Sequence, residues 1–357
     1  MGELSKIGKG FTPSTSNPSF WDGELYWLSI ADLNQGKYIK QTSKKISLEG
    51  SKNKDPIEKG TLLMSFKLSL GKLGILTKDM YTNEAICNFK WKNNNISTEY
   101  MYYYLSSINI MKYGSQAAKG ITLNNETLNT IPVILPNFDE QNKISNFLSK
   151  IDKKIELLEK KHQAYEDFKK YLMQQIFTQK LRFDFKDEWK ITKLGEITKI
   201  NTGNKDVKDK IDNGKYPFFV RSEKVERINS YSFDGEAILI PGDGKIGEVY
   251  HYINGKFDYH QRVYKISDFK NNINGKYIYY YLEKNFLKQA LKNSAKATVD
   301  SLRMDTLTKM PIELPSFEEQ VEIVDILSLA DEKIGLIEKN IKISKHFKRG
   351  LLQQMFV

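Results

Sequence analysis

The sequence predicts an α+β protein in which two similar globular domains are each followed by one long helix. A stretch of 46 residues occurs twice without a gap, because residues 132–177 match residues 311–356 at 21 positions. Apolar residues recur in both copies at alternating steps of three and four, which is typical of a long helix with one apolar stripe. Short runs of β-branched and aromatic residues precede each copy,. A repeat of this length divides the chain into two halves of one design.

The first domain is expected to span residues 1–136 and to be rich in strands. Runs of β-branched and aromatic residues, bounded by Gly, Asn, Ser and Lys, predict four strands. They lie at residues 26–30, 61–66, 73–77 and 85–89. A helix is expected at residues 98–107, because Tyr100, Ser107 and either Tyr103 or Tyr104 share one of its faces,.

The first long helix and a linker are expected within residues 137–186. Pro136 biases the residue before it away from a helical conformation,. Asp139 and Glu140 follow in the first turn, where the helix dipole favours acidic side chains,. No proline interrupts the stretch that follows, so a helix of roughly 40 residues and about 60 Å is predicted. Its apolar seam is expected to contain Ile144, Leu148, Ile151, Ile155 and Leu158,.

The second domain is expected to span residues 187–315 and to repeat the plan of the first. Framework segments match in the same order along the chain, whereas the segments between them diverge. Two copies of one fold with different surface loops are what recognition of two different targets requires. The matching segments are residues 194–200 with 1–7, 237–240 with 62–65, 244–247 with 71–74, 277–282 with 100–105, and 294–302 with 115–123.

The second long helix is expected within residues 316–357, with Glu318 and Glu319 in its first turn,. Neither helix can bury its apolar stripe alone, so we expect the two helices to pack against each other. The alternative, in which each helix packs only against its own domain, leaves the gapless repeat unexplained. The seam residues of the second helix are Ile323, Leu327, Ile334, Ile337 and Ile341.

Composition and charge restrict the class of protein. The 357 residues are 40% apolar, enough for two cores, and carry a net charge of +11,. A basic surface favours a polyanion as partner, although a genome biased toward lysine and asparagine would give the same excess. Cys87 is the only cysteine, which excludes an internal disulfide and a cysteine-based zinc cluster,. With no apolar run of 18 residues, a soluble cytoplasmic protein without a membrane segment is expected.

Two short motifs resemble cofactor or catalytic phrases but are better explained as turns. Residues 242–247 have the spacing G-x-G-x-x-G, yet a dinucleotide site must open a helix, and residues 248–253 are predicted to form a strand,. A hairpin turn is therefore expected. Residues 17–20 resemble the N-P-P-F/Y phrase of amino-methyltransferases but lack its second proline. No glycine-rich methyl-donor loop follows a strand elsewhere, so a proline turn is expected there.

The histidines also give no sign of a catalytic or metal site. His162 falls on the apolar seam, where Ile341 is its counterpart, so a polar core or interface residue is favoured over a metal ligand,. The other three, His251, His260 and His346, are not clustered with it in sequence. No phosphate-binding loop, zinc-deaminase phrase or nuclease carboxylate pair is found. The sequence therefore predicts no active site, no metal and no cofactor.

Without an active site, the two domains are expected to act by recognition. Their loops combine lysine and arginine with aromatic and small polar residues, the mixture that contacts DNA phosphates and base edges. For each loop taken singly, a solvated turn is the alternative. The candidate DNA-binding residues are Lys9, Phe11, Thr12, Lys67, Ser69, Lys72, Gln116, Lys119 and Thr122 in the first domain, and Thr202, Asn204, Arg221, Ser222, Lys245, Gln261, Arg262, Lys296 and Thr298 in the second.

This pattern resembles the DNA specificity subunit of Type I restriction-modification enzymes. The resemblance rests on two divergent domains, each followed by a near-identical long helix that opens Pro-x-x-x-Pro-x-Phe-x-Glu-Gln. The Leu-Gly-Glu-Ile phrase at residues 194–197 and the segment at residues 174–183 that closes the first helix also agree with it. The resemblance covers essentially the whole chain.

The resemblance implies that each domain is a target recognition domain that reads one half of a bipartite site on double-stranded DNA. The two helices would form an antiparallel coiled coil that sets the spacer, with the two halves related by a pseudo-twofold axis. Two modification subunits would dock on the chain and supply the methyl-donor site, and a motor and nuclease subunit would complete the restriction complex. The chain itself would be non-catalytic, and its partner would flip the target base, an adenine in this family.

One departure from the family pattern concerns the termini. Residues 178–192 have no counterpart at either end of the chain, whereas family members often carry more sequence at one terminus. A short natural form or a trimmed one is expected. Two alternatives stay open: an orphan or truncated scaffold that binds modification subunits without reading DNA, and a stand-alone DNA-modifying enzyme with unrecognised motifs.

Overall fold

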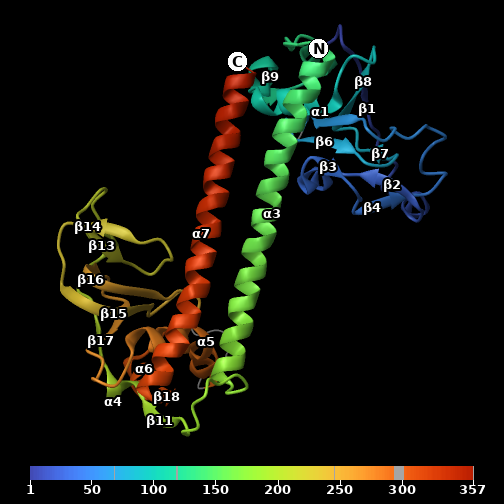
Figure 1. Cartoon of the computed structure of the whole chain (residues 1–357). Coiled ribbons are helices and arrows are strands. Elements are labelled where there is room, and N and C mark those ends of the chain that lie inside the picture. The colour runs from blue at the N-terminus through green and yellow to red at the C-terminus, as the bar shows by residue number, and fades with distance from the viewer. Residues whose placement is uncertain (68, 118–119, 245, 293–300, 357) are drawn as a thin grey trace. The chain divides into compact units, whose positions relative to one another are not determined.

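The computed structural model describes residues 1–67, 69–117, 120–244, 246–292 and 301–356. The chain forms two compact units, Met1–Glu159 with Lys339–Val357, and Lys160–Glu338. Each unit combines one domain of strands and helices with part of both long helices, α3 (Phe138–Phe177) and α7 (Phe317–Met355) (Figure 1). The protein is therefore α+β and built from two units of one design, as predicted.

The main sheet of the first unit has five strands in the order β1-β8-β5-β6-β3. Neighbouring strands are antiparallel except β3, which pairs with β6 in parallel. A smaller sheet has the order β4-β2-β7, and β9 and β10 form an antiparallel pair. All four predicted strands are confirmed, as β2, β5, β6 and β8. The strands are β1 (Ser5–Lys9), β2 (Leu25–Leu28), β3 (Tyr38–Ile39), β4 (Lys44–Ile46), β5 (Leu62–Ser65), β6 (Leu73–Leu76), β7 (Tyr81–Thr82), β8 (Ile86–Trp91), β9 (Ser115–Ala117) and β10 (Gly120–Thr122).

The helices of the first domain also agree with the sequence. The predicted helix at residues 98–107 forms as α1 (Thr98–Ser107), and α2 (Asn125–Asn129) follows it. The turn expected at residues 17–20 forms where the 3₁₀ helix η1 (Pro18–Trp21) begins, and the amide oxygen of Asn17 accepts a hydrogen bond from the Ser19 backbone at 3.1 Å. The three short 3₁₀ helices are η1 (Pro18–Trp21), η2 (Ala31–Gln35) and η3 (Ile110–Tyr113).

The main sheet of the second unit has six strands in the order β12-β17-β15-β16-β13-β14, and β11 pairs separately with β18. Its strands are β11 (Lys190–Lys193), β12 (Lys199–Thr202), β13 (Tyr216–Phe219), β14 (Glu226–Ile228), β15 (Phe233–Pro241), β16 (His251–Tyr259), β17 (Val263–Ser267) and β18 (Pro311–Leu314). Its helices are α4 (Leu194–Ile197), η4 (Val207–Asp209), α5 (Gly275–Lys292) and α6 (Met304–Thr308).

The two domains share a framework in space as well as in sequence. The order β12-β17-β15-β16 repeats β1-β8-β5-β6, and β13 pairs with β16 in parallel as β3 pairs with β6. Helix α5 follows β17 along the chain as α1 follows β8. The strand orders therefore confirm that both halves are copies of one fold, with different segments inserted between the shared elements.

The glycine-rich phrase at residues 242–247 connects two antiparallel strands, β15 and β16. It opens no helix, so the hairpin prediction is confirmed and a dinucleotide site is excluded there. The prediction of a strand at residues 248–253 was wrong at its start, because β16 begins only at His251. Gly244 and Gly247 have φ values of +77°, so the chain is still turning where a strand was expected,.

Both long helices begin where the sequence places them. The side chain of Asn137 accepts a hydrogen bond from the Glu140 backbone at 2.9 Å, and that of Ser316 accepts one from the Glu319 backbone at 3.2 Å. These residues cap the first turns, where the helix dipole favours the acidic side chains. The predicted length of roughly 40 residues is confirmed by 40 residues in α3 and 39 in α7.

Within the first unit α3 and α7 run antiparallel. Lys348 Nζ lies 2.6 Å from Asp152 Oδ1, and Lys345 Nζ lies 2.6 Å from Glu159 Oε1, so residue numbers rise along one helix as they fall along the other. The ten seam residues are buried or half-buried in their own units, with Leu148 and Leu327 fully buried. Each helix thus contributes side chains to the hydrophobic cores of both units.

A buried glutamine in each copy joins the start of the long helix to its domain. Gln141 donates to the carbonyls of Pro136 and Asn95 and accepts from the backbone N–H of Ser97, at 2.8, 3.0 and 2.9 Å. Its counterpart Gln320 makes the corresponding three bonds in the second unit, at 3.2, 3.3 and 2.9 Å. The Glu-Gln phrase repeats in the sequence because both copies need this joint.

A buried phenylalanine ends each copy and packs on the helix of one domain. Phe356, at the end of α7, lies edge-on to Tyr100 and Tyr104 of α1, with ring centroids 5.4 and 5.7 Å apart. Phe177, at the end of α3, packs in the same way on two tyrosines of α5, Tyr277 and Tyr281. Each domain therefore contacts the beginning of one long helix and the end of the other.

Candidate nucleic-acid interface

The topology of the first unit brings separate loops to one end of its sheet. Strands β1 and β5 end there and β8 begins there, because Lys9 pairs with Cys87 and Ser65 pairs with Ile86. The segment after β1 is fixed to this end, since Thr12 hydrogen-bonds to both Asn83 and Glu84. Six of the predicted DNA-binding residues lie at these strand ends or in the loops next to them: Lys9, Phe11, Thr12, Lys67, Ser69 and Lys72.

The corresponding end of the second sheet also collects six predicted residues. Strands β12 and β15 end there and β17 begins there, and the segment after β13 reaches the same place through the ion pair of Arg221 with Asp243. The loop after β12 is held against the β17 side, because the Gln261 backbone N–H donates to the Lys205 carbonyl at 2.8 Å. Gly203 permits this approach, since a Cβ there would lie 1.9 Å from the Tyr259 carbonyl oxygen. The residues brought together are Thr202, Asn204, Arg221, Ser222, Gln261 and Arg262.

Two arginines in this group share one carboxylate. Arg221 Nη1 lies 3.2 Å from Asp243 Oδ1, and Arg262 Nη1 lies 3.3 Å from Asp243 Oδ2. Both arginine side chains are exposed, whereas Asp243 is largely buried. The carboxylate orients two guanidinium groups that are free on their outer edges to bind phosphates or guanine. Asp243 lies within the glycine-rich turn, and sequence reasoning missed its role because no local pattern announces an ion pair between distant loops.

A buried histidine supports the same corner. His260 Nδ1 accepts a hydrogen bond from the Arg262 backbone at 2.9 Å. Burial, and then the nearby Arg221 charge, lower the pKa of His260, so the ring is neutral at pH 7,. Its Nε2 lies 4.0 Å from Asp206 Oδ2. His251 Nε2–H donates to the Ser222 carbonyl at 3.1 Å, and burial likewise lowers the pKa of His251. Both histidines therefore hold loops in place at this corner.

The predicted residues of the first domain have less uniform surroundings. Lys9, Lys67 and Ser69 are exposed. Lys72 is half-buried, and its Nζ donates to Asn34 Oδ1 at 2.7 Å. Phe11 packs edge-on against Tyr81 at 5.8 Å and belongs to a small apolar cluster, which gives it a structural role. Lys54 Nζ lies 4.4 Å above the Phe11 ring and places a further positive charge there that the sequence did not single out.

Several predicted residues cannot be placed. Lys119, Lys245, Lys296 and Thr298 lie outside the described residues, and for Gln116 and Thr122 only the backbone strands β9 and β10 are described. On the far side of one of these gaps the chain returns to the same end of the second sheet, because Leu302 N–H donates to the Gly242 carbonyl at 2.8 Å.

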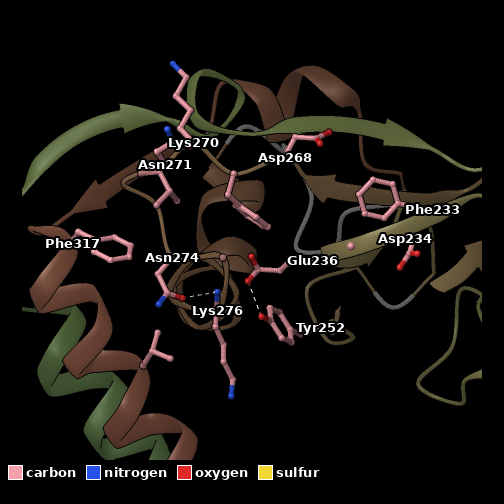
Figure 2. A pocket seen from close by; sticks show the side chains of 15 residues that line it. Phe233, Asp234, Glu236, Tyr252, Asp268, Lys270, Asn271, Asn274, Lys276 and Phe317 are labelled. Carbon is pink, nitrogen blue, oxygen red and sulfur yellow. Dashed lines mark hydrogen bonds between the residues drawn. The ribbon is translucent and has the colours of Figure 1, made fainter. Parts of the chain in front are cut away.

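A depression of about 650 Å³ lies at the opposite end of β15 in the second unit (Figure 2). Two of its polar side chains are engaged: Glu236 Oε1 accepts from the Tyr252 hydroxyl at 2.6 Å, and Asn274 Oδ1 accepts from the backbones of Lys276 and Tyr277. No nucleophile is paired with a base among the side chains that line it. Figure 2 therefore shows a surface depression without the parts of an acyl- or phosphoryl-transfer site.

Within the described residues, no three His, Cys, Asp or Glu side chains are grouped so that they could hold a metal ion. None of the helices in the same ranges is long and apolar enough to span a bilayer.

The long helices expose the same apolar residues in both copies. Leu157 and Leu336 are 53% and 54% exposed, and Phe168 and Phe347 are 50% and 53% exposed. Phe138 and its counterpart Phe317 are equally exposed, at 41% each. Isolated exposed apolar residues need no explanation, but the same residue type kept exposed at three repeated positions indicates a contact surface present twice.

Comparisons with known proteins identify one family. A family model described as Type I restriction modification DNA specificity domain matches residues 1–166 and 186–344. The Type I restriction enzyme EcoDI specificity subunit of Escherichia coli is 32% identical over 169 residues, which are 46% of this chain and 37% of that protein. The MjaIX specificity subunit of Methanocaldococcus jannaschii is 26% identical over 264 residues, 66% of this chain and 60% of that protein. The MjaVIII specificity subunit of the same organism aligns with 95% of this chain and 87% of its own length at 26% identity.

Solved structures share the whole fold. The S subunit of a Type I restriction-modification system from M. genitalium has a TM-score of 0.67 at 16% identity, covering 100% of this chain and 94% of that one. A chain from a study of complex assembly and conformational transition of the Type I R-M system has a TM-score of 0.60, also at 16% identity, covering 99% and 96%. At this identity the likeness establishes the fold alone.

Proposed function

Because the chain belongs to the family of specificity subunits of Type I restriction-modification systems, we propose that it recognises a bipartite site on double-stranded DNA. The domains within residues 1–136 and 187–315 would each read one half-site. The observation that supports this most directly is topological. In both domains, basic and polar residues from separate segments lie at the same end of the sheet, where they can enter a groove of the DNA together.

We place the base-reading contacts of the second domain at its paired arginines. An arginine can bind guanine through two hydrogen bonds in the major groove, and Arg221 and Arg262 are both exposed and oriented by Asp243,. The negative charge of Asp243 repels DNA phosphates. The two arginines are therefore better placed to contact a base edge than the phosphate backbone. Lysines such as Lys9 and Lys67 would contact phosphates and make binding depend on salt.

The long helices within residues 137–186 and 316–357 would set the spacer and bind two modification subunits. The exposed apolar residues repeated on both helices support this, because a surface present twice suits two copies of one partner,. The partners would supply the methyl donor and flip the base, and a motor and nuclease subunit would complete the restriction complex in the cytoplasm. This chain would contribute recognition and no chemistry.

The proposal is tested by purifying the chain with its cognate modification subunits and mapping methylated sites across the host genome. We expect a split motif with one fixed spacer. A tight complex that methylates without sequence preference would favour a scaffold that reads no DNA. Methyl transfer or DNA cleavage by the purified chain alone, with methyl donor or Mg²⁺, would instead identify a stand-alone enzyme and overturn the proposal.

A further inference from the structure

A polar cluster in the first unit ties the helix of its domain to both long helices. The hydroxyl of Tyr103 on α1 donates to Asp152 Oδ2 on α3 at 2.7 Å and lies 3.2 Å from Ser149 Oγ. Lys348 Nζ on α7 lies 2.6 Å from the other oxygen of the same carboxylate. Tyr103 is fully buried. One carboxylate therefore joins three helices through a directed hydrogen bond and an ion pair,.

The second unit contains the same cluster with the two long helices exchanged. The hydroxyl of Tyr280 on α5 donates to Asp331 Oδ2 on α7 at 2.7 Å and lies 3.4 Å from Ser328 Oγ. Lys169 Nζ on α3 lies 2.8 Å from Asp331 Oδ1. Each helix supplies the serine and the aspartate to one unit and the lysine to the other. We name these two four-residue groups the first and second clasp.

Each domain adds one residue of its own to the shared clasp. In the first unit Lys37 Nζ lies 2.7 Å from Ser149 Oγ and 3.3 Å from the Tyr103 hydroxyl. In the second unit Glu283 binds Lys169 at 3.1 Å. The first clasp is thus enriched in positive charge and the second in negative charge. The common residues belong to the framework, whereas these additions come from the domains.

A clasp of this kind determines orientation more than stability. Apolar surfaces of helices can slide or rotate with little loss of buried area, whereas a hydroxyl bonded to a carboxylate loses its bond when the donor turns away. Burial raises the pKa of the Tyr103 and Tyr280 hydroxyls, so both stay protonated donors throughout the physiological range,. Both carboxylates and Lys348 are partly exposed, where ion pairs add little stability, whereas Lys169 is buried,.

We propose that the two clasps are positioning devices that fix the angle of each domain on the helix pair and thereby restrict the spacer length that the protein accepts. Tyr103, Asp152 and Lys348 position the first domain, and Tyr280, Asp331 and Lys169 position the second. This inference rests on the proposed reading of a split DNA site. It predicts that loosening a clasp changes which spacers are accepted while leaving each half-site sequence unchanged.

The test uses the full complex with modification subunits and a set of DNA duplexes that carry both half-sites at spacers differing by one base pair. The double variant Tyr103→Phe with Tyr280→Phe removes two hydroxyls and keeps both rings. Its preference for the native spacer over spacers one base pair longer or shorter should fall about tenfold, as expected for loss of a hydrogen bond to a charged group. Tyr231→Phe, which alters an exposed tyrosine of the second domain, should keep the wild-type preference.

Other outcomes separate the possible roles. Lys169→Arg with Lys348→Arg retains both ion pairs and should retain spacer preference. If the double tyrosine variant does not assemble, the two single variants provide the same comparison. Equal losses of methylation at every spacer, with the ratio unchanged, would show that the clasps only stabilise the fold and would overturn the inference. A wild-type complex that modifies no split site at any spacer would overturn the proposed function and this inference with it.

Discussion

The paired arginines show how a single residue in this protein takes its role from segments far away in the chain. Arg221 and Asp243 follow β13 and β15, Arg262 lies just before β17, and the ion pairs form where β17 begins beside the end of β15. Sequence reasoning selected both arginines, since arginine in a variable loop of a recognition domain is a good candidate for base contact. It missed Asp243, because a carboxylate in a glycine-rich turn gives no local indication of its partners.

Replacing Arg262 with alanine should relax recognition of the second half-site only. Loss of one bidentate contact costs about 1–3 kcal/mol of discrimination against a wrong base. In a methylation assay on a library of randomised half-sites, one position of the second half-site should lose its preference while the first half-site keeps its own. Lys256→Ala serves as the control, because Lys256 is exposed and pairs with Asp234 near the start of β15. Equal weakening on all sequences would assign Arg262 to a phosphate instead.

Acid should destabilise the corner that His260 supports. A pKa lowered in the folded protein means that the unfolded chain binds the proton more readily, so protonation favours unfolding,. The contribution of neutral His260 is complete above the unfolded pKa of about 6.5 and is lost as the pH falls below it toward the folded value. His260→Gln retains an acceptor and should reduce the fall in urea-unfolding stability between pH 7.5 and 5.5. His346 is exposed, so His346→Gln should leave that fall unchanged and serves as the control. An unchanged fall in His260→Gln as well would contradict the burial of a neutral His260 ring.

At the scale of elements, the sequence predicted best what local chemistry decides. Four strands of the first domain, α1 and both long helices follow from runs of side chains and from helix starts that a polar cap and acidic residues mark. The parallel strands β3 and β13 were not predicted, because their pairing depends on contacts distant in sequence. The start of β16 was misplaced because Glu248 to Tyr250 has the composition of a strand but follows a glycine that keeps the chain turning.

The glutamine joints predict a stability effect shared by both copies. Gln141 and Gln320 are buried, and each satisfies backbone groups of two segments. Changing either to alanine leaves a buried N–H and carbonyls without partners, which costs about 1–3 kcal/mol. Urea unfolding should show this loss for Gln141→Ala and Gln320→Ala. The repeated but exposed Gln174 and Gln353 provide matched controls, and their alanine variants should stay within about 0.5 kcal/mol of wild type,.

At the scale of the whole molecule, the repeat distinguishes residues that hold the fold from residues that face a partner. Some repeated residues are buried in both copies, as Phe177 and Phe356 are, and others are exposed at similar levels in both copies, as Phe168 and Phe347 are. The first kind follows from packing within each unit. The second kind has no partner within its own unit that explains an exposed phenylalanine, so a contact with another protein is the stronger explanation.

This distinction yields a prediction about stoichiometry. Phe168→Asp and Phe347→Asp each place a charge on one copy of the exposed surface, where the change should leave the unfolding free energy nearly unaffected,. Native mass spectrometry of the assembled complex should then find one modification subunit on each single variant and none on the double variant, against two on the wild type. Leu329→Asp is the control, since Leu329 is equally exposed but its counterpart in the first copy is Lys150. A double variant that still binds two subunits would show that the partners dock elsewhere, and a single variant that loses both would show that the two sites bind cooperatively.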